Sequence, residues 1–473
     1  MNAPGRPSAS KGGRRAPPVS PLLGLVLAAA LMSPVPSLAQ GMLRGALDPL
    51  PGADEDFSPY AMNPEAEPAS AFAAPVDGAD EAPEISGPEP LPEPYRTPRR
   101  ARRDDPEPYE PLGIRTGAFL VKPSLTLRGG YDSNPQNDPV PQGSAYGRVD
   151  GRIDVESDWI RHQFRGRLEA GYTAYDKLPD ENGADYAADA ALRLDVRNDI
   201  RADFAFHGSL DNDTRDDPEL IGVTTTEQNL RLGGRAGVVY KPGRISIAPT
   251  LDVLRVDYGD PDLHDRDYTE ADLRLRTGVE LSPALEPFVE AAVNKRTYDV
   301  DINDNGIAHN TDGYRIYAGA RFEPDPIWTA EAKIGYGRQE AEDAAIPAES
   351  GLVAEGTVIW QPSDLTRLRL STGRTVDSTT RECCAVGSSV YARAGFDHEF
   401  REWLILSGEA GFRQSDYPDG ERLRDFDAEL ELEYKLNRMM SAIGRVEYRK
   451  LETTDGSGNY DATKVEVGLR MQR

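Results

Sequence analysis

Residues 164–174 read FRGRLEAGYTA. Every even-numbered residue in this stretch is apolar or small, and Arg165, Arg167 and Glu169 stand between them. A period of two places alternate side chains on opposite faces of a β-strand, whereas a helix would scatter the apolar set around its axis. The stretch therefore predicts a strand with one apolar face and one charged face.

The same alternation recurs from residue 117 to the end of the chain. It is clear in residues 185–196 (DYAADAALRLDV), 229–238 (NLRLGGRAGV) and 426–434 (FDAELELEY). We count about eighteen such segments of roughly ten or more residues, long enough to cross an outer membrane at a tilt. We therefore predict an all-β fold for residues 112–473, a transmembrane antiparallel up-and-down β-barrel of about 18 strands (16–18).

The connections between these segments alternate in length. Residues 197–199 (RND) and 241–243 (KPG) are short and turn-like, whereas residues 132–144 and 299–312 are long and rich in Asp, Asn, Gly and Pro. Transmembrane barrels have short turns on the periplasmic side and longer loops outside the cell. An even number of strands would then leave both ends of the barrel in the periplasm.

The positions of the aromatic residues are typical of the same topology. All four tryptophans lie beside short turns, and many tyrosines lie near long loops. Two aromatic girdles at opposite strand ends mark the interfaces of a membrane barrel, and a soluble β-sandwich or solenoid would not predict them. The residues concerned are Trp159, Trp328, Trp360 and Trp403, and Tyr131, Tyr172, Tyr258, Tyr298, Tyr336, Tyr417 and Tyr448.

The N-terminal part of the chain predicts export. Residues 1–39 combine three basic residues within 11–15, an apolar core at 22–32 (LLGLVLAAALM) and a small-residue cleavage motif at 37–39 (SLA), as in a signal peptide. Residues 40–111 are dense in Pro, Ala and acidic residues, so we expect a disordered, acidic periplasmic segment. The expected location is the cell outer membrane of a Gram-negative bacterium.

Composition argues against a nucleic-acid partner and against a membrane-spanning helix. A net charge of -26 argues against nucleic acid as a partner, because phosphate binding requires a basic face. The mean hydropathy is -0.57, and the chain has no apolar run of the roughly 20 residues that a membrane helix needs. These features leave strands as the elements that could cross a membrane.

The beginning of the predicted barrel resembles a known family. Residues 117–123 (GAFLVKP), followed by 130–135 (GYDSNP), are similar to the start of the putative β-barrel porin type 2 family, found in alphaproteobacteria. The resemblance covers about residues 112–473 and implies an outer-membrane barrel, with little information about substrate. Many such barrels end in an aromatic residue that the assembly machinery recognises, whereas this chain ends in Gln472-Arg473.

Charged residues of both signs are expected to face the lumen. A barrel of 16–18 strands leaves an aqueous lumen unless a segment plugs it, and rings of charge tune ion selectivity. We expect a porin-like channel that transports small hydrophilic solutes or saccharides. The alternative is a non-conducting barrel for surface binding, or an accessory to polysaccharide export or secretion. The candidate pore-lining residues are Arg148, Asp150, Arg152, Asp154, Arg165, Arg167, Glu169, Arg274 and Arg276.

The expected partners are outer-membrane lipid and lipopolysaccharide, the outer-membrane assembly machinery and polysaccharide. One loop motif adds a candidate metal site, because oxygen ligands at positions 1, 3, 5 and 12 around a glycine are the pattern of an EF-hand calcium loop. The pattern also arises by chance in a loop rich in Asp and Asn, and no other cofactor is expected. The candidate Ca²⁺ ligands are Asp301, Asn303, Asn305 and Asp312.

Enzymatic chemistry is not indicated. His207, Ser209 and Asp211 share one strand face, but residues two apart on a strand stand about 7 Å apart, too far for a proton relay. Cys383 and Cys384 are adjacent in a long loop, and they form either a strained vicinal disulfide or two idle thiols.

Overall fold

A computed structural model describes residues 109–211, 228–303, 306–381, 384–456 and 458–473. The predicted signal peptide and nearly all of the predicted disordered segment lie outside the described residues. No helix among the described residues is long and apolar enough to span a bilayer.

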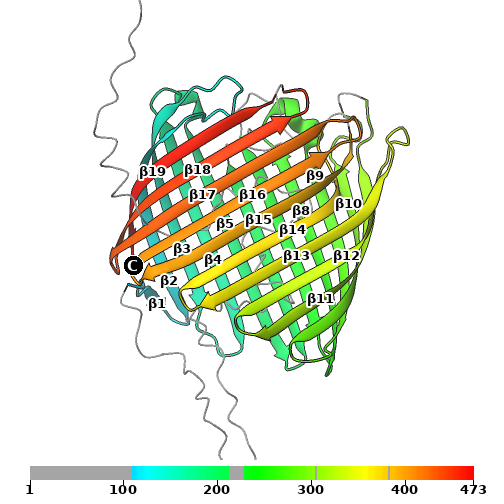
Figure 1. Ribbon diagram of the computed structural model, residues 1–473, viewed down its shortest axis with the longest axis horizontal. Coiled ribbons are helices and arrows are strands. Elements are labelled where there is room, and N and C mark those ends of the chain that lie inside the picture. Colours follow the sequence, from blue (N-terminus) through cyan, green and yellow to red (C-terminus); the bar gives the residue numbers. More distant parts are fainter. Residues whose placement is uncertain (1–108, 212–227, 304–305, 382–383, 457) are drawn as a thin grey trace, which may run out of the picture.

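In this part of the chain, nineteen antiparallel strands form one sheet, and β2–β19 close into an 18-stranded barrel because β19 pairs with β2 (Figure 1). This confirms the predicted fold class and strand number. The short strand β1 (Ile114–Thr116) pairs with β2 through a turn at Gly117, whose φ of 62° favours glycine. The barrel strands are β2 (Phe119–Asp132), β3 (Ser144–Ser157), β4 (His162–Tyr175), β5 (Gly183–Arg197), β6 (Ile200–Asp211), β7 (Asn229–Tyr240), β8 (Ile245–Tyr258), β9 (Tyr268–Val279), β10 (Leu285–Tyr298), β11 (Thr311–Asp325), β12 (Trp328–Ala341), β13 (Glu349–Ser363), β14 (Thr366–Ser378), β15 (Val386–Arg401), β16 (Leu404–Asp416), β17 (Arg422–Asn437), β18 (Met440–Thr453) and β19 (Tyr460–Gln472).

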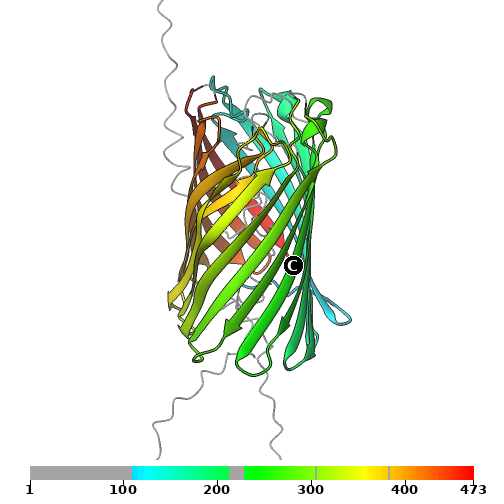
Figure 2. The ribbon, with the colours of Figure 1, turned by 90° about the vertical axis from the view of Figure 1, so that its right-hand side faces the viewer.

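The two ends of the barrel differ in their connections. Residues 198–199 and 364–365 make short turns at one end, whereas residues 133–143 and 299–310 make long loops at the other. The C-terminus and the start of β2 lie at the turn end, as an even strand number requires (Figure 1). The barrel is broader in Figure 1 than in the view turned by 90° (Figure 2), so its cross-section is elongated.

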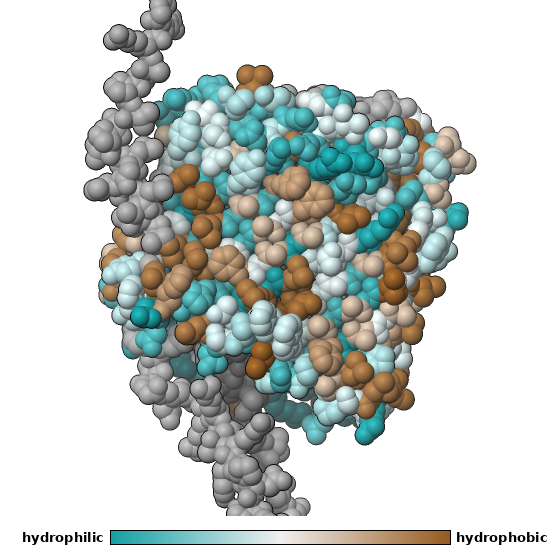
Figure 3. Space-filling model, in the orientation of Figure 1, coloured by the Kyte–Doolittle hydropathy of each residue, from teal (hydrophilic) through white to brown (hydrophobic). Residues whose placement is uncertain are grey.

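The outer face of the barrel is apolar in the middle of the strands. Val289 and Val293 on β10 are 56% and 55% exposed, which is the arrangement that lipid contact requires. Figure 3 shows hydrophobic residues over much of the barrel wall, and hydrophilic residues gather at the loop end. On β4, Leu168, Ala170, Tyr172 and Ala174 belong to this outer face and are likewise exposed.

Aromatic residues form a girdle at the turn end. Trp328 stacks on Trp360 with ring centroids 5.0 Å apart, and Trp403 packs edge-on against Tyr434 at 5.3 Å. At the loop end, Tyr131, Tyr172, Tyr336 and Tyr448 are exposed on the outer face, as predicted. The prediction was wrong for three tyrosines, which are buried inside the loop end because the long loops fold over them: Tyr258, Tyr298 and Tyr417.

Candidate functional site

The charged face of the sheet is its concave, inner face. Lys333 on β12 lies 3.0 Å from Glu290 on β10, although β11 separates their strands. Arg315 on β11 likewise lies 2.6 Å from Asp272 on β9 across β10. Side chains can meet over an intervening strand only on the side toward which a closed sheet curves. The charged residues of the alternating pattern therefore point into the lumen.

Seven of the predicted pore-lining residues lie on the inner face of β3 and β4. Arg148 contacts Asp150 on the same strand at 2.6 Å, and Arg167 on β4 contacts Asp154 on β3 at 2.9 Å. Neighbouring guanidinium and carboxylate groups thus form a ladder along this wall. Its predicted members are Arg148, Asp150, Arg152, Asp154, Arg165, Arg167 and Glu169, and Arg152 approaches Asp154 at 2.7 Å and Glu169 at 3.6 Å.

The other two predicted residues lie on β9, far from the first group around the barrel. Arg274 contacts Asp252 on β8 at 2.9 Å. Arg276 contacts Glu290 at 2.7 Å, and its guanidinium lies 4.0 Å from the centroid of the Phe288 ring. The structure therefore divides the nine predicted residues between two walls of the lumen and does not bring them together in one site.

The two walls differ in their access to water. The side chains of Arg167 and Asp154 are 30% and 33% exposed, whereas those of Arg276 and Glu290 are 9% and 2% exposed. Charged groups on β3 and β4 consequently remain partly hydrated, and so does Arg274 on β9 with 28% exposure, while Arg276 and Glu290 are packed among other side chains.

An acidic row on β17 was not among the predicted pore-lining residues. Five alternate residues of this strand are acidic, and they occupy the face opposite the exposed Phe426, Leu430 and Tyr434. Arg445 on β18 contacts two of them, Glu429 at 3.1 Å and Glu431 at 2.9 Å. The alternation in residues 426–434 already predicts that these acids share one strand face. The row is Asp425, Asp427, Glu429, Glu431 and Glu433.

The acidic row has further acids directly beside it. In the strand register, Glu429 stands opposite Glu409 of β16 on one side and Glu447 of β18 on the other. The guanidinium of Arg393 on β15 contacts Glu409 and lies 3.2 Å from Asp427. Sequence periodicity cannot reveal such lateral neighbours, because they depend on the register between strands.

One hairpin folds into the lumen at the loop end. Strand β14 pairs with β13 only as far as Arg374, but it stays paired with β15 up to Ser378. The Ser378 hydroxyl lies 2.7 Å from that of Thr311 on β11, and the Gln339 amide on β12 donates to it at 2.9 Å. The β14–β15 hairpin thus crosses the inner face of three strands and narrows this end of the barrel.

Loops join the same constriction. The Tyr298 hydroxyl donates to the carbonyl of Thr379 at 2.9 Å, and the Tyr298 ring stacks on His309 with centroids 3.7 Å apart. Tyr298 also belongs to a buried cluster with Leu263 of the β8–β9 loop and Tyr268. Three tyrosines near the loop end are buried in this packing. Tyr258 and Tyr298 were predicted to lie at the membrane interface, and Tyr268 was not assigned a position.

Titratable groups in the long loops have altered pKa values. Burial lowers the pKa of His309 below its ordinary value of 6.5, since its imidazole is almost fully enclosed. Burial also raises the pKa of the Asp267 carboxyl, although this group accepts a hydrogen bond from the Tyr258 backbone N–H. The Asp299 carboxyl has a lowered pKa because it accepts hydrogen bonds from the Arg255 guanidinium.

The candidate calcium loop is only partly described. Asn305 lies outside the described residues, and the Asn303 side-chain oxygen accepts the backbone N–H of Ile307 at 2.9 Å. Asp312 is exposed on β11, where it stands opposite Lys295 of β10. Within the described ranges, no group of three or more His, Cys, Asp and Glu side chains is arranged to hold a metal ion. Calcium binding stays a prediction.

Of the two cysteines, Cys383 lies outside the described residues. Cys384 is buried and disulfide-bonded, so it does not carry an idle thiol. It packs with Tyr417 and Leu423 under the loops.

His207 on β6 has its Nδ1 2.7 Å from the Asp189 carboxylate of β5, a cross-strand pair that the sequence pattern did not predict.

One family model and several solved structures are similar to this chain. A family model described as Putative beta-barrel porin 2 matches residues 107–473. No curated protein sequence matches the chain. Two of the similar solved structures are the outer membrane protein OpdK from Pseudomonas aeruginosa and a BenF-like porin from Pseudomonas fluorescens Pf-5. Each is 10% identical, and each alignment covers 75% of this chain and 99% of the other, with TM-scores of 0.40 and 0.38.

Proposed function

The chain belongs to the Putative beta-barrel porin 2 family and is a porin-like outer-membrane barrel, and on this basis we propose that it is a diffusion channel for small hydrophilic solutes or saccharides. The observation that carries the proposal is the partly hydrated ladder of opposite charges on β3 and β4. Its groups are 11–33% exposed, so water and polar solutes can reach them. Charges of both signs would replace part of the hydration of a permeating solute.

In this proposal the long loops face the exterior, and both termini lie in the periplasm together with the acidic N-terminal segment. The outer apolar face would contact lipid and lipopolysaccharide after insertion by the outer-membrane assembly machinery. In this proposal the solute passes beside β3 and β4, because Arg276 and Glu290 are buried and the β14–β15 hairpin narrows the loop end.

Planar-bilayer recording tests the channel. Purified barrel should give discrete conductance steps, and the same preparation after boiling should give none. Addition of a small neutral saccharide should reduce the current if the solute enters the lumen. Absence of steps from protein that still migrates as a folded barrel on an unboiled gel would contradict the proposal.

One observation favours the alternative of a non-conducting surface barrel. The inward hairpin is held by Thr311, Gln339 and Ser378 in a buried hydrogen-bond network, which is suited to a fixed plug as well as to a constriction. Replacing residues 379–385 by a short flexible linker separates the two. A conductance that appears only in this variant would identify the hairpin as a plug, and a conductance that merely increases would identify it as a constriction.

A further inference from the structure

Charges of alternating sign cross the inner face of four neighbouring strands, β2 to β5. Lys122 on β2 stands opposite Asp154 on β3, which in turn stands opposite Arg167 on β4. Arg167 also stands opposite Asp189 on β5. Facing residues of an antiparallel pair have Cβ atoms about 4.5–5.5 Å apart. A cation and an anion therefore lie side by side at each step of this row, within reach of one small molecule.

The step between Arg167 and Asp189 is open. Arg167 donates from Nε to Asp154 at 2.9 Å, and the Oδ1 atom of Asp189 lies 2.7 Å from the Nδ1 atom of His207. Among the described residues, the two terminal amino groups of Arg167 and the Oδ2 atom of Asp189 have no hydrogen-bond partner, and the two side chains form no ion pair with each other. This facing cation and anion thus both keep binding capacity for a solute.

The surroundings of this step are accessible and contain no ring. The side chains of Arg167 and Asp189 are 30% and 18% exposed. The inner-face residues of β3 within 148–154, of β4 within 165–171 and of β5 within 185–193 are all charged residues, Ala or Gly. A sugar ring stacks on the flat apolar surface of an aromatic side chain, and this wall does not offer one.

The charges restrict the kind of solute that can occupy the step. A solute with one net charge is attracted by one of the two groups and repelled by the other. A zwitterion satisfies both, because its carboxylate accepts hydrogen bonds from the terminal amino groups of Arg167 while its ammonium donates to Asp189. In an α-amino acid the two groups are attached to the same carbon atom, so one small molecule can contact facing residues of neighbouring strands.

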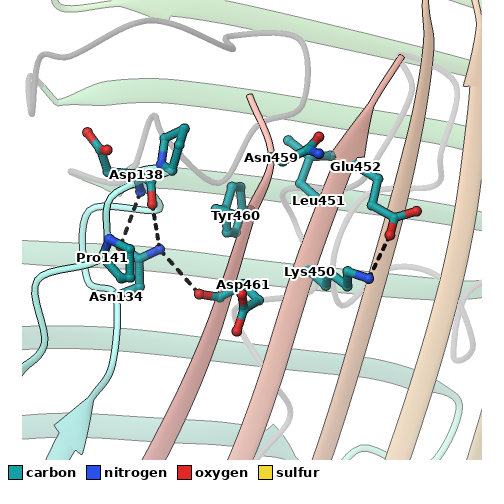
Figure 4. A pocket seen from close by; sticks show the side chains of 10 residues that line it. Asn134, Asp138, Pro141, Lys450, Leu451, Glu452, Asn459, Tyr460 and Asp461 are labelled. Carbon is teal, nitrogen blue, oxygen red and sulfur yellow. Dashed lines mark hydrogen bonds and ion pairs between the residues drawn. The ribbon is translucent and has the colours of Figure 1, made fainter. Parts of the chain in front are cut away.

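The small pocket at the loop end does not offer such a step (Figure 4). It encloses about 280 Å³ between the β2–β3 loop and the β18–β19 hairpin. The ammonium of Lys450 already contacts Glu452 at 2.6 Å, as the dashed line in Figure 4 shows. Tyr460 and Asp461 are consecutive in β19, so the ring and the carboxylate point to opposite faces of the hairpin and cannot contact one ligand together.

We propose that Arg167 and Asp189 bind zwitterionic solutes of the α-amino acid class as these pass along the β3–β5 wall. This inference rests on the channel proposed above, and it narrows the hydrophilic solutes to those that carry both an ammonium and a carboxylate. Arg152 and Glu169, 3.6 Å apart, are the next opposite charges toward the loop end. Conduction requires several sites that each bind weakly, and alternating charges provide such a series.

Saturation-transfer NMR on the full barrel in detergent micelles tests the site without conduction. The probes are alanine, alaninamide, N-acetylalanine and glucose. Alaninamide lacks the carboxylate of alanine, N-acetylalanine lacks its ammonium, and glucose lacks both. We expect alanine to bind most tightly and each of the other three probes to bind about tenfold more weakly, because each loses at least one charged hydrogen bond.

Two variants locate the binding site on the wall. Arg167→Gln and Asp189→Asn should each weaken alanine binding about tenfold, for the same reason. Arg369→Gln is the matched control, because the Arg369 side chain on β14 is 29% exposed, close to the value for Arg167, but directly contacts Asp397 at 2.9 Å. This pair is closed, so its loss should leave alanine binding unchanged.

The proposal is overturned if glucose, alaninamide or N-acetylalanine binds as tightly as alanine. The comparison of probes needs only the unaltered protein, so it decides even where a variant does not fold. The proposal is also overturned if Arg369→Gln weakens alanine binding as much as Arg167→Gln does, while both keep the mobility of a folded barrel on an unboiled gel.

Failure of the site and failure of the channel are distinguishable, because binding and conductance are measured separately. Conductance steps without alanine binding would overturn the site and retain the channel. Alanine binding by a protein that gives no steps would retain the site and contradict the channel.

Discussion

The guanidinium of Arg276 on β9 lies 2.8 Å from the carboxylate of Glu331 on β12, with two strands between them. Such a contact requires a strongly curved sheet whose side chains extend over their neighbours. It marks the wall where the lumen is filled. The wall along β3 and β4 keeps its charged groups partly exposed, so substitutions on the two walls should have different effects.

On the exposed wall, Arg167→Gln should change ion selectivity and leave stability nearly unaltered. Loss of this cation leaves Asp154 with Arg152 as its remaining contact and makes the local lumen more negative. Reversal potentials in a salt gradient should shift toward cation preference.

On the packed wall of β9 and β10, Arg276→Gln should instead lower the free energy of unfolding by about 1–3 kcal/mol, because Glu290 is buried and loses a charged hydrogen bond. Equal effects of both variants on selectivity would contradict the asymmetry.

A second prediction concerns the most buried ion pair. Arg296 on β10 and Glu270 on β9 lie 2.8 Å apart with side chains only 1% and 2% exposed. Arg296→Met should destabilise the barrel by about 3–5 kcal/mol, because it leaves the Glu270 carboxylate without this cation. The double variant Arg296→Met/Glu270→Gln should recover much of the loss. The temperature at which the unboiled gel band disappears measures both changes.

The control for this pair is the exposed Arg338–Glu340 contact on the outer face, whose side chains are 42% and 47% exposed. Arg338→Met should cost no more than about 1 kcal/mol, since exposed ion pairs contribute little. A cost equal to that of Arg296→Met would mean that burial does not set the strength of these pairs.

The acidic row on β17 gives a third prediction. Glu429 has an acid beside it on each neighbouring strand, so its carboxylate adds to a local concentration of acidic groups. Glu429→Gln should reduce cation preference, and neutralising Asp427 as well should reduce it further, because rings of charge set selectivity. Glu340→Gln removes a charge from the outer face and should leave the reversal potential unchanged. A shift in the opposite direction would exclude the row from the conduction path.

Sequence periodicity predicted most of the barrel for a physical reason. A strand such as β4 must bury charge on one face and expose Leu168 on the other, and this requirement is written in the order of its residues. The burial of residues at the loop end was harder to predict. Tyr298 and Tyr336 occur in similar positions near loops, yet one is buried under a loop and the other is exposed. Their difference follows from the strand face that each occupies, because Tyr298 shares the inner face of β10 with Arg296, whereas Tyr336 shares the outer face of β12 with Ile334. The alternation of each strand contains this difference, but proximity to a loop alone does not reveal it.

Some candidate site residues could be predicted from the alternation of one strand, and others could not. Arg165 and Arg167 were recognisable because their charges alternate with apolar residues on one strand. The pairing of Arg276 with Glu331, and the row of acids beside Glu429, arise from curvature and register among strands. These properties belong to the closed sheet, so they appear only once the barrel is assembled.

The fourth prediction is a pH dependence of the loop packing around His309. Burial lowers the pKa of this histidine below 6.5, so the packed loops bind fewer protons than the opened ones between 6.5 and the native pKa. The packing is therefore strongest above that range and weakens as the pH falls through it, by at most about tenfold in the opening equilibrium per pH unit. Arg296, Arg266 and Asp265 are the charged groups near the ring, and the two arginines oppose protonation.

Limited proteolysis of residues 299–310 at about pH 7.5 and about pH 5.5 measures this effect, with faster cleavage expected at the lower pH. His309→Phe keeps a ring for stacking on Tyr298 but cannot titrate, so its cleavage should lose the pH dependence. It also loses the hydrogen bond that Nε2 donates to the Val300 carbonyl, which raises cleavage equally at both pH values. His264→Phe replaces an exposed histidine of the β8–β9 loop and should retain the dependence. If His264→Phe abolishes it and His309→Phe does not, the titrating group lies outside the tyrosine stack.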